Sequence, residues 1–230
     1  MWTIEDQKER EAVNESELLV GHVLADDHQW SCRATGGTDG ISFGDPDGLL
    51  HLAVQPSKGE TLPVAVENYV RGDEWKVTFP QSTGQFGLRI SLRAVAVSAT
   101  RLVLEPTLSI QTSLLDTHPT LIFSAVGEHP ESSLIQVESS EQEVSVTSVR
   151  LADRAGQIAV LLGPHDAPFT ADHSSDQKLQ LQLFGEFLEK GVIRKARPWV
   201  VLDRSEAGLS TSDLQQYAKL LCETPLPLTA

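Results

Sequence analysis

The feature that most constrains the fold is the strict alternation of apolar and polar residues in Leu88-Arg-Ile-Ser-Leu-Arg-Ala-Val-Ala-Val97. Successive side chains of a strand point to opposite faces, so this pattern is typical of a strand with one buried face and one solvated face. Similar alternation recurs at Val64/Val66, Trp75/Val77/Phe79, Leu108/Ile110, Val144/Val146, Ile158/Val160/Leu162 and Leu179/Leu181/Leu183. The sequence therefore predicts many strands.

Turn residues separate these runs at the spacing of β-hairpins, as in Asp45-Pro-Asp-Gly48, Arg71-Gly-Asp73 and Gln81-Ser-Thr-Gly84. Such spacing favours a sandwich over alternating strands and helices. We therefore predict an all-β, mainly antiparallel, two-sheet β-sandwich of roughly a dozen strands with one C-terminal α-helix. In length and strand content it is similar to the galactose-mutarotase-like supersandwiches. The histidine and glutamate motifs of that family have no counterpart here, so the similarity concerns architecture alone.

The predicted organisation has three parts. Residues 1–17 are mostly charged or polar and form a tail or helix that adds little to the core. Residues 18–205 form the β-sandwich domain, and residues 206–230 form a helix and tail packed on the same domain. In the sandwich, Phe86–Val97 and Arg101–Leu114 should form the largest hairpin, which places Pro106 at an edge or a bulge.

Helical spacing is clear near the C-terminus, where apolar residues recur at i, i+3, i+4 and i+7: Leu214, Tyr217, Ala218 and Leu221. Ser212 is the expected N-cap, with Gln215 three residues later, and Pro225 ends the helix. A single helical turn is predicted at Phe184–Leu188, with Gly191 as its C-cap. The alternative for this segment is a continuation of the strand at Leu179–Leu183.

Charge and composition exclude several classes of partner. The formal net charge of −14 opposes the attraction that drives non-specific binding to nucleic acids and to anionic membranes. No apolar run approaches the roughly 18 residues that cross a bilayer, and the first residues lack a secretory apolar segment. Cys32 and Cys222 are far apart in sequence, which favours reduced thiols. A soluble cytoplasmic protein is expected.

The charges are unevenly distributed. Residues 102–149 contain acidic side chains but no lysine or arginine, whereas basic side chains gather at Lys190, Arg194, Lys195, Arg197 and Arg204. Opposite patches of this kind are compatible with self-association, although solvated surface explains most charge runs.

Candidate chemical groups concentrate in Gly163–Asp176, the longest irregular segment between strong strand patterns. It carries His165, Asp166, Asp172 and His173, which with His118 or His129 would supply nitrogen and oxygen ligands to a metal or a general acid and base. The spacing matches no established metal motif, and no phosphate-loop or dinucleotide motif is present, so no cofactor is predicted.

Two tryptophans are candidates for ligand contact. Trp30 and Trp199 lie in strand-like segments, and an exposed indole ring would stack on the C–H face of a sugar. The alternative is that both belong to the core.

Two functions remain open. One is a non-catalytic binding or interaction module for a carbohydrate or a protein. The other is an enzyme that acts on a sugar or another small polar substrate through a site drawn from His118, His129, His165, Asp166 and His173. An enzyme requires these groups to converge in one cleft, whereas a module leaves them scattered.

Overall fold

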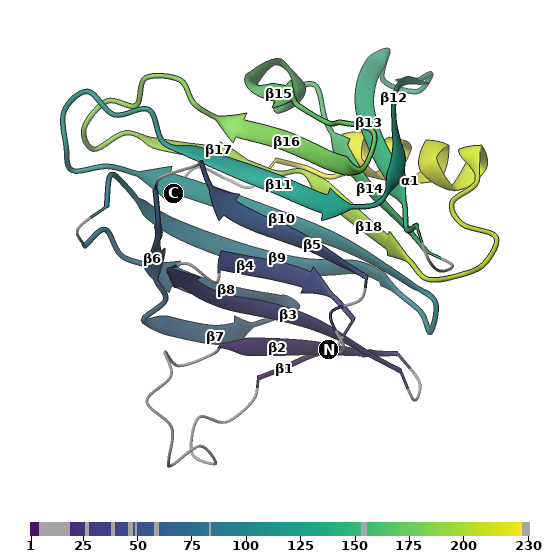
Figure 1. Ribbon diagram of the computed structural model, residues 1–230, viewed down its shortest axis with the longest axis horizontal. Helices are drawn as coiled ribbons and strands as arrows, with labels where there is room; N and C mark the ends of the chain where they lie inside the picture. The colour runs from purple at the N-terminus through teal and green to yellow at the C-terminus, as the bar shows by residue number, and fades with distance from the viewer. Residues whose placement is uncertain are drawn as a thin grey trace.

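The computed structural model describes residues 1–4, 19–25, 28–37, 40–45, 48, 50–57, 60–82, 84–152 and 156–226. It contains two antiparallel sheets and one C-terminal helix, which confirms the predicted two-sheet all-β sandwich. Figure 1 shows the sheets stacked face to face, with the helix beside β14 and β18.

The first sheet contains nine described strands in the order β1-β2-β3-β4-β5-β11-β16-β15, and β6 pairs with β3. Their bounds are β1 Trp2–Ile4, β2 Val20–Ala25, β3 His28–Gly37, β4 Gly40–Gly44, β5 His51–Pro56, β6 Leu62–Val64, β11 Thr120–Val126, β15 Thr170–Asp172 and β16 Lys178–Phe184.

The second sheet also contains nine described strands, in the order β12-β13-β14-β18-β10-β9-β8-β7, and β17 pairs with β10. Their bounds are β7 Glu67–Arg71, β8 Glu74–Phe79, β9 Gly87–Val97, β10 Arg101–Gln111, β12 Glu128–Val137, β13 Gln142–Arg150, β14 Gln157–Leu162, β17 Ile193–Ala196 and β18 Trp199–Asp203. A 3-10 turn η2 spans Ala167–Phe169, and the helix α1 spans Thr211–Glu223.

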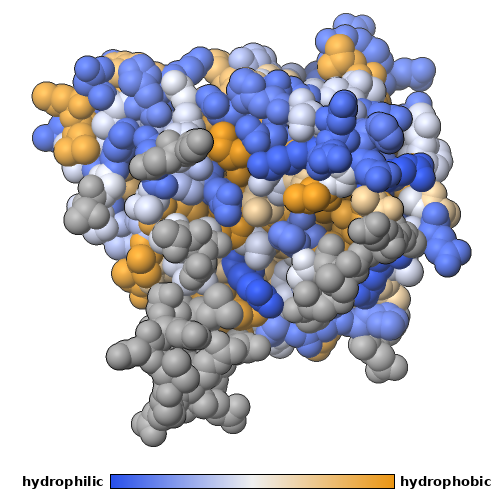
Figure 2. Space-filling view, in the orientation of Figure 1, coloured by the Kyte–Doolittle hydropathy of each residue, from blue (hydrophilic) through white to orange (hydrophobic). Residues whose placement is uncertain are grey.

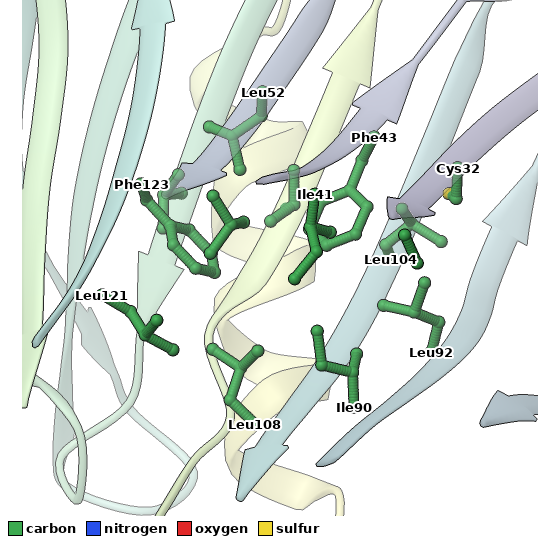
Figure 3. Close-up of a cluster of buried hydrophobic side chains, with 14 of the residues drawn as sticks. Cys32, Ile41, Phe43, Leu52, Ile90, Leu92, Leu104, Leu108, Leu121 and Phe123 are labelled. Carbon is green, nitrogen blue, oxygen red and sulfur yellow. The ribbon is translucent and has the colours of Figure 1, made fainter. Parts of the chain in front are cut away.

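The main core lies between the sheets. Figure 3 shows Ile41 and Phe43 of β4 and Phe123 of β11 facing Ile90 of β9 and Leu104 of β10. These core contacts come from the same alternating apolar residues from which the strands were predicted. Only every second side chain of a strand points inward.

A second hydrophobic cluster lies on the outer face of the second sheet, beneath α1. It joins Val103, Leu161 and Val201 of the sheet to Ala218 and Leu221 of the helix. Strands β14 and β18 are therefore buried on both faces, and the molecule has three layers. Every residue of β14 is buried, which is typical of a strand covered on both sides.

The predicted β9–β10 hairpin is present, and the placement of Pro106 follows from its pairing. On one side Pro106 lies opposite Leu92 of β9. On the other side β10 pairs with β18 at Arg101–Leu104 and with β17 at Leu108–Gln111. Pro106 lies in the gap between these two partners, where its missing N–H group removes no ladder hydrogen bond.

Three predictions about local structure need correction. Helix α1 begins two residues earlier than expected, because Ser210 is the N-cap and forms a capping box with Asp213. The Phe184–Leu188 segment forms no helix, since Phe184 has φ +64° and Leu188 is bridged to Thr117. The first residues are not wholly polar tail: Trp2 lies in β1, is 4% exposed and packs against the Trp75 ring at 5.7 Å between centroids. Residues 5–17 lie outside the described residues.

The two cysteines are free and lie far apart in the layered structure. Cys32 is buried in the core between the sheets, where burial raises the pKa of its thiol well above the usual value. Cys222 lies on α1 at the other face of the second sheet. No described helix is long and apolar enough to cross a membrane.

Candidate functional site

Two crossings between the sheets frame a pocket of about 310 Å³. The segment after β14 leaves the second sheet, passes through η2 and enters the first sheet as β15. The segment after β16 returns from the first sheet to β17 in the second. Both crossings occur at the same end of the sandwich, so side chains from distant parts of the chain meet there.

The pocket has a mixed lining. Its polar side chains are His165, Asp166, Thr170, Glu186, Arg194 and Lys195, and its apolar side chains are Phe169, Leu183, Phe184 and Ala196. Phe169 is 53% exposed, so part of this apolar residue is accessible at the wall of the pocket. This lining can contact the apolar face of a ligand and hydrogen-bond its polar groups.

Asp166 is held at the pocket wall by the backbone around it. Its Oδ2 accepts a hydrogen bond from the Arg197 backbone N at 3.2 Å, and its carbonyl oxygen accepts from Phe169 N at 3.1 Å and Thr170 Oγ1 at 2.9 Å. Burial raises the pKa of Asp166, and the bond and charge of Arg197 offset only part of this effect. Desolvation therefore disfavours the carboxylate form.

The opposite wall comes from the β16–β17 crossing. Arg194 Nη1 donates to Glu186 Oε2 at 2.5 Å, which fixes both side chains beside the pocket. Phe184 lies in the left-handed region with φ +64°, a strained conformation for a bulky residue. Such backbone strain concentrates at functional sites.

A smaller pocket of about 170 Å³ adjoins the first and shares His165 and Asp166 with it. Its far wall is the end of α1, including Cys222. The buried Arg197 guanidinium donates to the carbonyl oxygens of Leu221, Thr224 and Pro225 there, so it holds the helix end in place.

The other candidate histidines do not line either of these pockets. His118 is an exposed residue with Nε2 3.9 Å from Asp116 Oδ1, and its ring lies 5.9 Å from that of Phe187. His129 and His173 are also exposed, and their backbone N–H groups donate to the carbonyl oxygens of Asp176 and Gln180. The five proposed catalytic residues therefore do not converge: only His165 and Asp166 share a pocket.

The structure does not bring the metal candidates His165, Asp166, Asp172 and His173 together. Among the described residues, which include all four, no three histidine, cysteine, aspartate or glutamate side chains are placed to hold a metal ion. Asp172 is instead engaged by hydroxyl groups, since Ser132 Oγ donates to its Oδ2 at 2.7 Å. Burial alone would raise the pKa of Asp172, but hydrogen bonds from Ser174, Ser132 and Thr147 lower it overall.

For Trp30 and Trp199, the candidates for stacking on a sugar, the structure favours the alternative that both belong to the core. Both residues are 0% exposed. Trp30 Nε1 donates to the Ser98 carbonyl oxygen at 3.0 Å, and Trp199 Nε1 donates to Glu105 Oε2 at 2.8 Å. Both rings belong to the core, so the sugar-stacking role cannot be theirs.

The basic residues near the C-terminus do not form one free patch. Arg194 pairs with Glu186, and Arg197 is buried against the end of α1. Arg204 pairs with Asp45 at 2.8 Å and lies 4.3 Å from the centre of the Trp30 ring. These internal contacts leave less basic surface for self-association than the sequence indicated.

Comparison with known proteins gives no relative from which the role of this pocket could be inferred. No family model, curated protein or solved structure matches the chain. The function must therefore be argued from the pocket itself.

Of the ten residues that line this pocket, sequence reasoning named two as site candidates. It identified His165 and Asp166 from the long segment after β14, but it did not connect them with Phe169, Glu186 or Phe184. An aromatic residue after proline in a predicted loop, Pro168-Phe169, was one available signal. The meeting of the two crossings had no signal, because it depends on tertiary topology.

Proposed function

We propose that the protein is a non-catalytic binding module, and that the 310 Å³ pocket holds a small polar ligand of about the size of a single sugar ring. The observation that carries the proposal is the pairing of the exposed Phe169 ring with a rim of charged and hydroxyl side chains in one pocket. The volume lies at the lower end of the range for small-molecule sites, roughly 300–1,000 Å³.

The lining favours a sugar over a purely apolar ligand. A pyranose ring has C–H faces that pack on an aromatic ring and hydroxyl groups that exchange hydrogen bonds with planar polar side chains. Phe169 supplies the ring, Asp166 and Glu186 supply acceptors, and Arg194 supplies donors. An apolar ligand would remove water from these polar groups without offering them hydrogen bonds in return, which is unfavourable.

Binding without catalysis is favoured by the dispersal of the titratable groups. Only two of the five candidate residues, His165 and Asp166, line the pocket. The second candidate function, an enzyme acting on a sugar, is favoured by one observation: the raised pKa of Asp166, which is a property of proton-transferring carboxyl groups.

The proposal is tested by thermal unfolding of the full chain with a panel of neutral monosaccharides and uronates. A ligand at a hundred times its dissociation constant adds about 2.7 kcal/mol, which for a chain of this length raises Tm by about 5–11 °C. Phe169→Ala should abolish the shift. Phe187→Ala is the matched control, because Phe187 is 45% exposed but does not line the pocket.

Three outcomes contradict the binding module. The panel gives no shift, or Phe169→Ala and Phe187→Ala behave alike, or proton NMR shows that a bound sugar is converted to another species. Conversion that is lost in Asp166→Asn would establish the enzyme instead.

A further inference from the structure

The two sheets end in strands of very different length. The end strands of the first sheet, β1 and β15, have three residues each. The end strands of the second sheet are β7, with five residues, and β12, with ten. Short end strands are one way in which proteins prevent edge-to-edge pairing. Strand β12 lacks this protection.

The beginning of β12 is blocked, but its second half is not. The register with β13 shifts between Glu128 and Glu131, Pro130 lies in the shifted part, and His129 N donates to the Asp176 carbonyl oxygen at 2.9 Å. Residues 132–137, here called the β12 edge, pair in continuous register with β13 and contain no proline, lysine or arginine. On its other side, no described strand pairs with it.

The two faces of the β12 edge have different surroundings. Ile135 and Val137 join the hydrophobic cluster beneath α1. Leu134 lies on the opposite face of the strand, together with Ser132, whose hydroxyl contacts Thr147 and Asp172. Leu134 is 66% exposed. An extended segment paired with this edge would place alternate side chains beside Leu134 and on the face of Glu131, Ser133 and Ile135.

The charge around the edge determines which segment fits. The β12–β13 hairpin carries exposed glutamates at Glu128, Glu131, Glu138, Glu141 and Glu143, and residues 102–149 contain no lysine or arginine. The basic side chains of the hairpin, His129 and Arg150, both lie at its base, away from residues 132–137. Figure 1 shows this hairpin projecting at the upper right, and in the same orientation Figure 2 shows a mostly hydrophilic surface there with a small hydrophobic spot. Two copies joined at this edge would bring like charges together, whereas a basic segment would neutralise them.

We propose that the β12 edge is a docking site for a partner protein's extended segment in which lysine or arginine alternates with apolar residues. The segment adds a strand to the second sheet through main-chain hydrogen bonds. Its apolar side chains lie beside Leu134, and its basic side chains lie on the opposite face, which carries the exposed Glu131. This interaction is independent of the ligand pocket.

The probe is a capped, fluorescently labelled heptapeptide in which lysine and valine alternate. We expect saturable binding to the full chain by fluorescence anisotropy, weakened as salt rises from about 50 mM to about 500 mM because the charges are exposed. Hydrogen exchange should slow at backbone amides of residues 132–137. The same peptide N-methylated at alternate residues keeps its charge but cannot complete a β ladder, and it should not bind.

Leu134→Lys should lower the affinity about tenfold or more, since it adds a repelling charge and removes the apolar contact. Val66→Lys is the matched control, because Val66 is 68% exposed and precedes β7 at the opposite end of the sheet. The proposal is overturned if the N-methylated peptide binds equally well, if the two variants bind alike, or if the heptapeptide does not bind. It is also overturned if the chain alone dimerises by light scattering and Leu134→Lys abolishes that dimer, because a second copy then occupies the edge.

Discussion

Replacing Glu105 by glutamine tests the buried charge cluster that supports α1. The Glu105 carboxylate is 9% exposed and accepts from Arg93 Nε at 3.2 Å, Arg93 Nη2 at 3.0 Å and Trp199 Nε1 at 2.8 Å. Arg197 Nη1 lies 3.7 Å away, and the Arg197 side chain is 8% exposed. Glutamine keeps one acceptor oxygen but removes the negative charge, so the buried Arg197 loses the carboxylate that lies 3.7 Å from its Nη1.

The expected loss of stability depends on which ion-pair partner of Glu105 is buried. Removing one partner of a fully buried ion pair costs about 3–5 kcal/mol. Arg93 is 30% exposed and can be resolvated, which reduces its share, and Arg197 keeps its three carbonyl acceptors at the end of α1. We therefore expect Glu105→Gln to lower the free energy of unfolding by about 2–4 kcal/mol.

The assay is equilibrium unfolding in urea, followed by tryptophan fluorescence and by circular dichroism so that two-state behaviour is checked. The matched control is Glu74→Gln. Glu74 also accepts from a charged group and a hydroxyl, at 2.7 Å from Lys76 and 2.8 Å from Ser91, but its side chain is 35% exposed. Glu74→Gln should lower the free energy of unfolding by only about 0–1 kcal/mol. Equal losses in the two variants would refute the argument that burial of the Arg197 charge sets the cost.

Two further predictions concern titration and capping. Asp166→Asn should raise stability at neutral pH, because burial raises the folded-state pKa of Asp166 and its protonated form is therefore favoured by folding. In the wild type, the stability contributed by protonated Asp166 is present below the unfolded-state pKa and is lost as pH rises through the folded-state pKa. Thermal unfolding should therefore show that Asp166→Asn is more stable than the wild type at neutral pH but not in acid. A stability advantage that persists in acid would contradict burial of the carboxylate as its cause. Ser210→Ala should lower the unfolding free energy by about 1 kcal/mol, since Ser210 caps α1 and its hydroxyl bonds lower the pKa of Asp213. In chemical denaturation Ser212→Ala is the control, and an equal loss in both variants would show that the capping box adds nothing.

The local pattern of apolar and polar residues was sufficient to predict many of the strands and the helix. The alternation at Leu88–Val97 predicted β9, and the spacing of Leu214, Tyr217, Ala218 and Leu221 predicted α1, because each pattern reports one buried face. The failures have different causes. At Phe184 the helical spacing is overridden by a strained turn that starts the crossing to β17. The N-cap was predicted two residues too late, at Ser212, because only the Ser210–Asp213 hydrogen bonds show which serine caps the helix.

The candidate site was less predictable. His165 and Asp166 were accessible to sequence reasoning because they lie in a long segment between strong strand patterns. Their partnership with Phe169 and Arg194 was not, since Arg194 joins the pocket only through the return of the chain to β17. The burial of Trp30 and Trp199 was not readable either, because the strand pattern alone does not say whether a second layer covers a face.

By itself, the sequence determined that this chain forms strands with one or two apolar faces and one amphipathic helix, since hydrophobic periodicity is a local property. It also determined that residues 102–149 carry acidic side chains but no lysine or arginine. Only the tertiary structure decided which strands are neighbours, that α1 covers β14 and β18, and that two crossings enclose a pocket. These features depend on contacts between residues far apart in the chain, and such contacts leave no periodic trace in the order of residues.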